Sequence, residues 1–164
     1  MPITHPRIVA ADRVLLAGVR VRMSFTNDRT SELWRNFRSR ENEVVGRVGS
    51  DSFSVKVYGP EYSFTSFDPT AEFDKWAAVK VDWGSKQKDG FENLEVTGGD
   101  YAVFVHLGPA SDASRTFGHI FRSWLPDSGY DLDRRPHFEV LPKGYDPFDP
   151  EAEEEVWVPI RSRV

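Results

Sequence analysis

Residues 98–129 have the sequence GGDYAVFVHLGPASDASRTFGHIFRSWLPDSG, which predicts a strand followed by a helix. The run from Tyr101 to His106 is rich in aromatic and β-branched residues and lies between a glycine pair and Gly108-Pro109, as is typical of a strand. Ser111 or Asp112 can cap the helix, and Pro126 and Gly129 are expected to end it. One helical face carries apolar residues at the spacing i, i+3, i+4, i+7, i+8, namely Phe117, Ile120, Phe121, Trp124 and Leu125.

The other segments of the chain also have the patterns of strands and helices. Alternation and helical spacing predict a strand at 14–25, a helix at 32–45 and further strands at 53–58, 73–83, 138–141 and 153–160. Residues 1–12 are expected to be a loose lead-in, and residues 85–93 a polar, mobile segment.

The order strand, helix, strand, strand thus occurs in two halves, about 13–83 and about 98–161, and Phe-Asp-Pro precedes the last strand of each. We therefore predict an α+β fold: a duplicated strand–helix–strand–strand pseudo-dimer, with an antiparallel sheet, two main helices and a central cleft.

Composition narrows the class of protein. With 164 residues, we expect a single domain over 1–164 with a substantial core. There is no cysteine, so neither a disulfide framework nor a thiolate metal site is expected. No apolar run is long enough to cross a bilayer and the N-terminus lacks a signal-peptide core, which predicts a cytoplasmic protein without membrane contacts. The net charge of −5 argues against direct nucleic-acid binding.

Four motifs resemble one known family. The chain is similar to the GyrI-like domain, also called the AraC-type or BmrR-type effector-binding domain or SHS2 fold, over about 13–161. The second half carries its typical segments in order: Gly98–Pro109, Trp124–Tyr130, Pro136–Glu139 and Glu155–Ile160. In the first half, Leu33–Phe37 and Phe73–Val81 resemble the matching repeat.

This resemblance implies a domain that binds small, often cationic or lipophilic molecules in a cleft between two repeats, in multidrug binding or transcription regulation. Some members are fused to a DNA-binding helix-turn-helix; we expect a stand-alone member here. The family often has an aromatic where this chain has Ala110, and a tyrosine where it has Trp157. The second departure removes a phenol that an acid-catalysed mechanism would use.

Glu155 is the principal candidate for a site residue. On the last strand Val156, Val158 and Ile160 point to one side, and Glu155 and Trp157 to the other. The first side is apolar enough to be core, which places Glu155 beside an indole at the cleft. A carboxylate among aromatic rings is poorly solvated, so its pKa is expected to rise and its ionised form to attract a cation. The alternative is that Glu155 only ends a solvated acidic run.

Other aromatic residues are candidates for the cleft wall, where each well-placed ring adds about 0.5–2 kcal/mol of cation–π attraction. They are Trp34, Trp76, Tyr101 and Trp124, and plain core packing is the alternative for each. Trp76 falls near the place in the first repeat that Glu155 holds in the second, so the two are expected to face each other across the pseudo-axis.

Cofactor chemistry is disfavoured. The histidines have no partners at metal-ligand spacing, and neither G-x-S-x-G nor a phosphate-binding glycine loop occurs, so no metal or cofactor is expected. Three functions stay open: a binding module for an amphipathic, cationic or aromatic compound; a hydrolase of cyclopropane-bearing toxins in which Glu155 is the acid or base; and a gyrase-inhibitor-like protein that contacts a protein partner.

Overall fold

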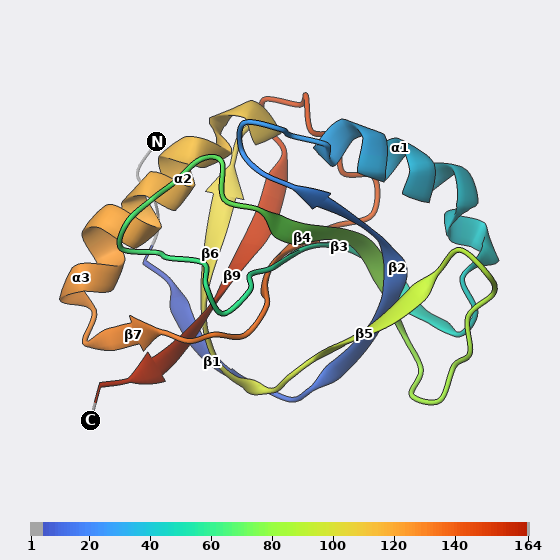
Figure 1. Ribbon diagram of the computed structural model, residues 1–164, viewed down its shortest axis with the longest axis horizontal. Coiled ribbons are helices and arrows are strands. Elements are labelled where there is room, and N and C mark those ends of the chain that lie inside the picture. The colour runs from blue at the N-terminus through green and yellow to red at the C-terminus, as the bar shows by residue number, and fades with distance from the viewer. Residues whose placement is uncertain (1–4, 164) are drawn as a thin grey trace.

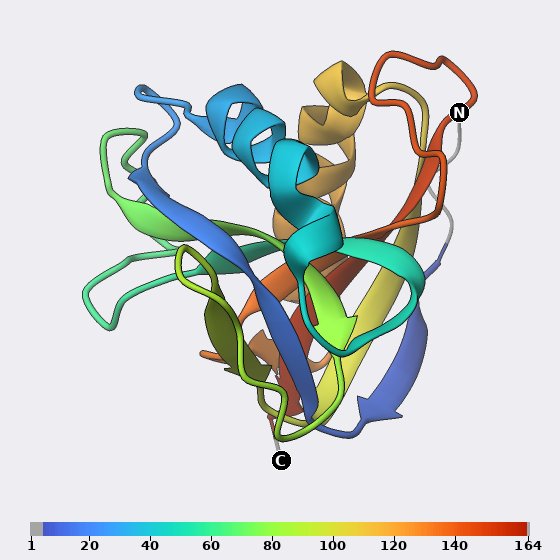
Figure 2. The same cartoon turned by 90° about the vertical axis from the view of Figure 1, so that its right-hand side faces the viewer.

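The computed structural model describes residues 5–163, which form one antiparallel sheet of nine strands with helices against one face (Figures 1 and 2). The first half contains β1 (Arg7–Ala11), β2 (Val14–Met23), α1 (Thr30–Arg40), η1 (Glu41–Glu43), β3 (Arg47–Val57), β4 (Phe73–Val81) and β5 (Glu92–Val96). The second half contains β6 (Gly99–Leu107), η2 (Ala110–Asp112), α2 (Ala113–His119), η3 (Ile120–Trp124), α3 (Leu125–Asp127), β7 (Tyr130–Leu132), β8 (His137–Leu141) and β9 (Glu153–Ser162). Within this part of the chain, no helix is long and apolar enough to cross a membrane.

The strand order is symmetric about its centre. It runs β1-β6-β9-β8-β3-β4-β2-β5, and β7 pairs with β9 outside this path. The unit β2, α1, β3, β4 therefore matches the unit β6, α2–α3, β8, β9, with β3 and β8 meeting in the middle. The predicted duplicated α+β fold is confirmed.

The sequence before the last strand of each unit aligns without a gap. Residues 67–76 read FDPTAEFDKW and residues 148–157 read FDPEAEEEVW, so six of these ten positions are identical. The turns also match, because Asp68 Oδ1 accepts the Thr70 amide at 2.9 Å and Asp149 Oδ1 accepts the Glu151 amide at 2.8 Å. The alignment makes three pairs of positions equivalent: Phe73 with Glu154, Asp74 with Glu155, and Trp76 with Trp157.

The sheet buries both of its faces. On the helix side, Leu33 and Phe37 of α1 pack against β2 and β4, and Ile120 of η3 packs against β6 and β9. On the other face, Val9 of β1 and Leu94 of β5 join a single apolar cluster, although these strands are the two opposite edges of the sheet. The sheet must therefore curl until its edges approach each other, away from the helices (Figure 1).

Three short strands were missed by the sequence prediction. Residues 7–11, expected to be a loose lead-in, form β1 against β6, and residues 92–96, partly assigned to a mobile segment, form β5 against β2. Residues 130–132 form β7 against the end of β9. These strands have weak local signals because their stability comes from partners distant in sequence.

The predicted helix ends were also partly wrong. The first helix ends at Arg40 rather than at 45, and the turn η1 follows. The second helix continues past Pro126 because a π-helical segment, η3, precedes α3 and places the proline in the first turn of α3, where a missing N–H has no cost. The apolar face predicted from Phe117 to Leu125 packs against β6 and β9 as expected.

Candidate functional site

The helix-facing side of the two central strands is polar. α1 covers β2 and β4, and α2 with η3 covers β6 and β9, so β3 and β8 lie between the helices. Between the two helices, the helix-facing surface of the sheet carries charged and polar side chains instead of apolar ones. They come from β3, β4, β8 and β9. We call them the central polar strip: Ser54, Lys56, Lys75, His137, Glu139 and Glu154.

These side chains are nevertheless withdrawn from water. Ser54, Lys75, His137 and Glu154 are buried, and Lys56 keeps only a small exposed fraction. Aromatic rings supply much of the cover. The Lys56 ammonium lies 4.3 Å from the ring centre of Phe117, and the His137 ring stacks on Phe64 at 5.4 Å.

One ion pair spans the middle of the strip. Lys56 Nζ lies 3.9 Å from Glu139 Oε1, and these residues come from the adjacent strands β3 and β8. His137 beside them is neutral, because burial, with smaller contributions from Lys56 and Arg135, lowers its pKa to about 3. Burial likewise lowers the pKa of Lys75 to about 8.

Glu154 has the most unfavourable environment in the strip. It is only 3% exposed, and its polar neighbours are Glu139 and Tyr145 rather than a basic side chain within ion-pair distance. Burial, reinforced by the neighbouring Glu139 carboxylate, raises the pKa of Glu154 to about 8. Tyr145, on the loop between β8 and β9, places its hydroxyl beside Glu154. Burial, followed by the charge of Glu154 and a hydrogen bond to it, raises the pKa of Tyr145.

Glu155, the principal sequence candidate, lies on the opposite face of the sheet. Trp157 Nε1 donates to Glu155 Oε1 at 3.1 Å, so the carboxylate and indole are adjacent as expected. Arg7 Nη2 of β1 lies 2.6 Å from Glu155 Oε2, and the Glu155 side chain is 34% exposed. Its charge is therefore already balanced by a partner on an edge strand that the sequence prediction had missed.

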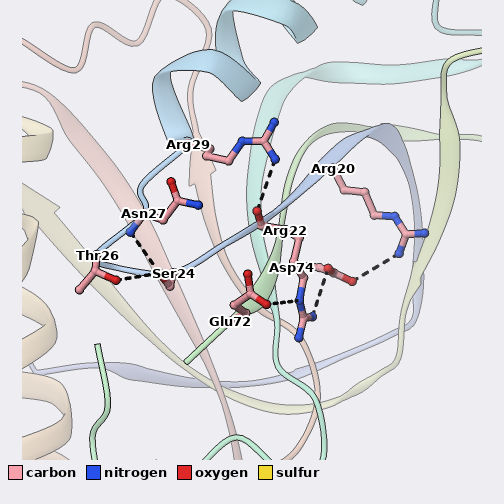
Figure 3. A network of polar contacts seen from close by, with 8 residues as sticks. All are labelled: Arg20, Arg22, Ser24, Thr26, Asn27, Arg29, Glu72 and Asp74. Atoms are coloured by element: carbon pink, nitrogen blue, oxygen red, sulfur yellow. Dashed lines mark hydrogen bonds and ion pairs between the residues drawn. The ribbon is translucent and has the colours of Figure 1, made fainter. Parts of the chain in front are cut away.

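The equivalent acid of the first repeat is balanced in the same way. Asp74 lies 3.3 Å from a nitrogen of Arg20 and 3.4 Å from one of Arg22, and Figure 3 shows both guanidinium groups beside its carboxylate. An arginine-paired acid thus occurs at this position in both repeats.

The candidate aromatic residues divide between the two faces. Trp157, Tyr101 and Trp76 join one buried cluster on the inner face, where Tyr101 and Trp157 are 5.5 Å apart. Trp34 and Trp124 lie on the helix side, the former under Arg38 of α1 and the latter against Phe104. In the alignment of the repeats Trp76 is the counterpart of Trp157, and it lies two positions after Asp74, the counterpart of Glu155.

Of the surface hollows among the described residues, two are relevant to the site. The larger, of about 450 Å³, lies at the β6–α2 connection, and a second of about 10 Å³ lies beside Tyr58 and His137. Glu155 lines neither hollow. The second lies at one end of the central polar strip and includes Phe64 and Arg135 in its wall.

Glu154, Glu139 and Tyr145 were not among the predicted site residues. One signal was available: Glu154 is in phase with Val156, Val158 and Ile160, so it shares their buried face. Which part of that face α2 covers depends on where the helix lies, and local sequence does not reveal this.

Comparison with known proteins identifies the fold's family. A model of the GyrI-like small molecule binding domain matches residues 4–161. The chain belongs to this family. The GyrI-like domain is 27% identical over 159 residues to the transcriptional regulator BrlR of Pseudomonas aeruginosa, covering 95% of this chain and 55% of the regulator. It is 39% identical over 74 residues to the probable transcriptional regulator YgiV of Escherichia coli, covering 43% of this chain and 45% of that protein. The GyrI-like domain thus spans about half the length of the regulators it matches.

Solved structures show the same fold at low sequence identity. SAV2435 bound to tetraphenylphosphonium superposes with a TM-score of 0.76 at 12% identity, covering 96% of this chain and 94% of the other. The EcmrR C-terminal domain gives a TM-score of 0.73 at 12% identity, with 99% of each chain covered. A hydrolase from Listeria innocua gives 0.62 at 10% identity, with 98% and 94% covered. These structures show the same fold, a curled antiparallel sheet with two helices.

Proposed function

We propose that this GyrI-like domain binds a lipophilic or aromatic cation on the central polar strip, between α1 and α2. The observation that carries the proposal is the pair of carboxylates, Glu139 and Glu154, on adjacent strands in a buried, aromatic-lined environment. A cation there gains charge attraction strengthened by the low local dielectric, together with cation–π contacts. The similar structure of SAV2435 with tetraphenylphosphonium agrees with a ligand of this chemistry.

The strip is a better candidate than the predicted Glu155 and Trp157. Glu155 already has an arginine partner, and the rings beside it pack into closed core: Phe138 stacks on Trp157 at 5.2 Å. A ligand on the inner face would have to displace an ion pair and part of that core. On the strip, Glu154 has no cationic partner within ion-pair distance among the described residues, and its polar neighbours are Glu139 and Tyr145.

The ligand must gain access through the loops. Glu154 is covered from the side of residues 142–152, which carry Tyr145, and the other end of the strip is covered by Tyr58 and Phe64. Displacement of either aromatic cover would open the strip without changing the paired strands. A loop displacement that accompanies binding would also change the surface of the domain, and a sensing domain could signal the presence of its ligand through that change.

Calorimetric titration with tetraphenylphosphonium tests the proposal. At about pH 8.5, above the pKa of Glu154, the native protein should bind. Glu154→Gln and Glu139→Gln should each weaken binding at least about tenfold, because each removes a buried negative charge near the cation. Glu155→Gln is the matched control on the same strand, and it should change the dissociation constant less than about twofold.

The outcomes separate the two carboxylate sites. Loss of binding in Glu155→Gln with retention in Glu154→Gln would move the ligand to the inner face, as predicted from the sequence alone. Failure of the native protein to bind a panel of aromatic cations would refute the cationic ligand. Thermal unfolding of each variant shows that lost binding does not come from lost folding.

The relatives indicate the role of binding. We propose that the ligand acts as an effector, since BrlR and YgiV are named as transcriptional regulators. A direct test is to measure whether tetraphenylphosphonium changes protease cleavage in the loop 142–152. Protection in the native protein and its absence in Glu154→Gln would link binding to the loop.

Hydrolysis is a second candidate, favoured by the raised pKa of Glu154, which suits a general acid. The test is turnover of a cyclopropane-bearing electrophile by the native protein. If Glu154→Gln abolishes turnover while substrate still binds, the domain is a hydrolase; if the native protein gives no turnover, this candidate is excluded.

A further inference from the structure

Lys56 places its ammonium group among the same chemical groups that a ligand cation needs. The Nζ atom lies 3.9 Å from Glu139 Oε1, 4.3 Å from the ring centre of Phe117 and 5.9 Å from that of Phe25. A carboxylate and aromatic rings around one positive charge are the features by which proteins recognise organic ammonium groups. The central polar strip therefore already holds a cation in the free domain, and this cation belongs to the chain itself.

The groups around the Lys56 ammonium come from both repeats. Phe117 is on α2 and Glu139 is on β8, whereas Phe25 is in the connection between β2 and α1. Lys56 itself is paired with His137 across β3 and β8, the two central strands of the sheet. The ammonium therefore lies where the two repeats meet, which is where the proposed function places the ligand.

The outer end of this position is apolar and reaches the solvent. Phe25 is 47% exposed and Phe67 is 67% exposed, and their ring centres lie 5.8 Å apart. The Thr26 amide donates to the Pro69 carbonyl at 3.1 Å, which ties together the two loops that carry these rings. Exposed apolar side chains that adjoin one another suit the hydrophobic part of a ligand. A lysine head can also move out past such rings into water, because its four-carbon stem is flexible and apolar.

The geometry points to the position of the Lys56 ammonium as the cation subsite of this domain, filled in the free state by the lysine and taken over by the ligand. An amphipathic ammonium or phosphonium ion displaces the lysine head and gains the contacts with Glu139 and Phe117. Its hydrophobic body lies on Phe25 and Phe67. This inference rests on the proposed function, since it assigns the place of the ligand's charge on the same strip and the residue that competes for it.

Competition by Lys56 has two consequences for binding. The displaced side chain vacates the space that the head of the ligand enters, so the strip needs no preformed hollow at this point. The lysine also sets a threshold of affinity, because a ligand is retained only if it stabilises the displaced state by more than the lysine stabilises the free state.

Calorimetric titration with tetraphenylphosphonium at about pH 8.5 tests the competition. Lys56→Met keeps an unbranched side chain but removes the competing charge, so it should lower the dissociation constant at least about tenfold. Lys56→Arg keeps a cation beside Glu139, and its dissociation constant should stay within about threefold of the native value. When Lys56→Met is combined with Glu139→Gln the gain should disappear, because the carboxylate released by the lysine is then absent.

Lys75→Met is the matched control, since it removes the other lysine of the strip. Burial lowers the pKa of Lys75 to about 8, so most of its charge is already lost at pH 8.5. This variant should change the dissociation constant less than about threefold. An equal gain in Lys75→Met and Lys56→Met would show a general effect of charge and would overturn the competition for one subsite.

Displacement of the lysine can be observed directly in the native protein. With ¹³C in the lysine Cε atoms and the phenylalanine rings, the free protein should give a nuclear Overhauser contact between Lys56 and Phe117, and its absence from Lys56→Arg assigns it. Saturation with unlabelled tetraphenylphosphonium should abolish this contact. A contact that persists in the saturated complex, or an unchanged affinity in a folded Lys56→Met, would overturn the inference while leaving cation binding intact. If neither the native protein nor Lys56→Met binds tetraphenylphosphonium, the proposed function itself fails.

Discussion

His106 and Glu154 are paired across β6 and β9 and both side chains are buried, but the hydrogen bonds of the histidine go elsewhere. Since a carbonyl oxygen can only accept, His106 Nε2 donates to the Pro109 carbonyl at 3.1 Å, and Nδ1 is bonded to the Thr116 hydroxyl at 2.7 Å. Both ring nitrogens are therefore engaged. The polar groups that act on Glu154 are Glu139, Tyr145 and Lys75.

Glu154→Gln should alter how stability depends on pH. The carboxyl ionises near its ordinary value in the unfolded chain but only at about pH 8 in the folded protein. Between these values the folded state binds more protons, so the free energy of unfolding of the native protein should fall as pH rises. The variant should show a flatter profile and be more stable at pH 8 by an amount on the order of 4 kcal/mol at most. Urea unfolding between about pH 5 and 8 measures this; parallel profiles would show that Glu154 is solvated.

His137 should destabilise the fold at acidic pH. The unfolded chain binds a proton near pH 6.5, whereas buried His137 resists protonation until about pH 3. Stability should therefore be lost as pH falls through this window. His137→Phe keeps a ring against Phe64 and Tyr58 and removes the titrating group, so its unfolding free energy should vary less between about pH 6.5 and 4. An equally steep loss in the variant would assign the acid sensitivity to other groups.

Affinity for tetraphenylphosphonium should rise from about pH 7 to 9. The ligand does not titrate, but Glu154 becomes negative and Lys75 becomes neutral as pH passes about 8. Both changes favour a bound cation. Calorimetry in buffers of different ionisation enthalpy should also detect proton release on binding at pH 7. In Glu154→Gln the rise should be much smaller, and in Lys75→Met binding at pH 7 should be tighter than in the native protein. A pH-independent affinity would contradict the placement of the ligand on the strip.

The pair of Arg7 and Glu155 should contribute little to stability. Arg7 is about half exposed and Glu155 is 34% exposed, and such pairs are worth roughly 0–1 kcal/mol. Arg7→Ala and Glu155→Gln should each lower the free energy of unfolding by less than about 1 kcal/mol, and high salt should reduce the difference. A loss of several kcal/mol of unfolding free energy in either variant would mean that the pair is needed to hold the edge strand β1 in the curled sheet.

Much of the fold follows from local patterns. The alternation of apolar and polar residues in 14–23 and 153–160 predicts which side chains share a face of the sheet. The spacing from Phe117 to Leu125 predicts the buried side of the second helix. The repeated Phe-Asp-Pro segment indicated the duplication. The weak edge strands β1 and β5 could not be predicted in this way, because neither buries an apolar face until the curled sheet brings the other edge near.

Three consecutive acids, Glu153, Glu154 and Glu155, separate what sequence alone determined from what the tertiary structure decided. The alternating pattern determined that Glu154 points with Val156 and that Glu155 points with Trp157. It could not decide which direction leads to a site, because the sheet is buried on both faces. That decision came from the positions of the helices, which leave Glu154 between them on the covered face, and from β1, whose Arg7 reaches Glu155 across 148 residues of sequence. A carboxylate's solvation depends on all the atoms around it in space, and in this fold those atoms come from the other repeat and from the edge strands.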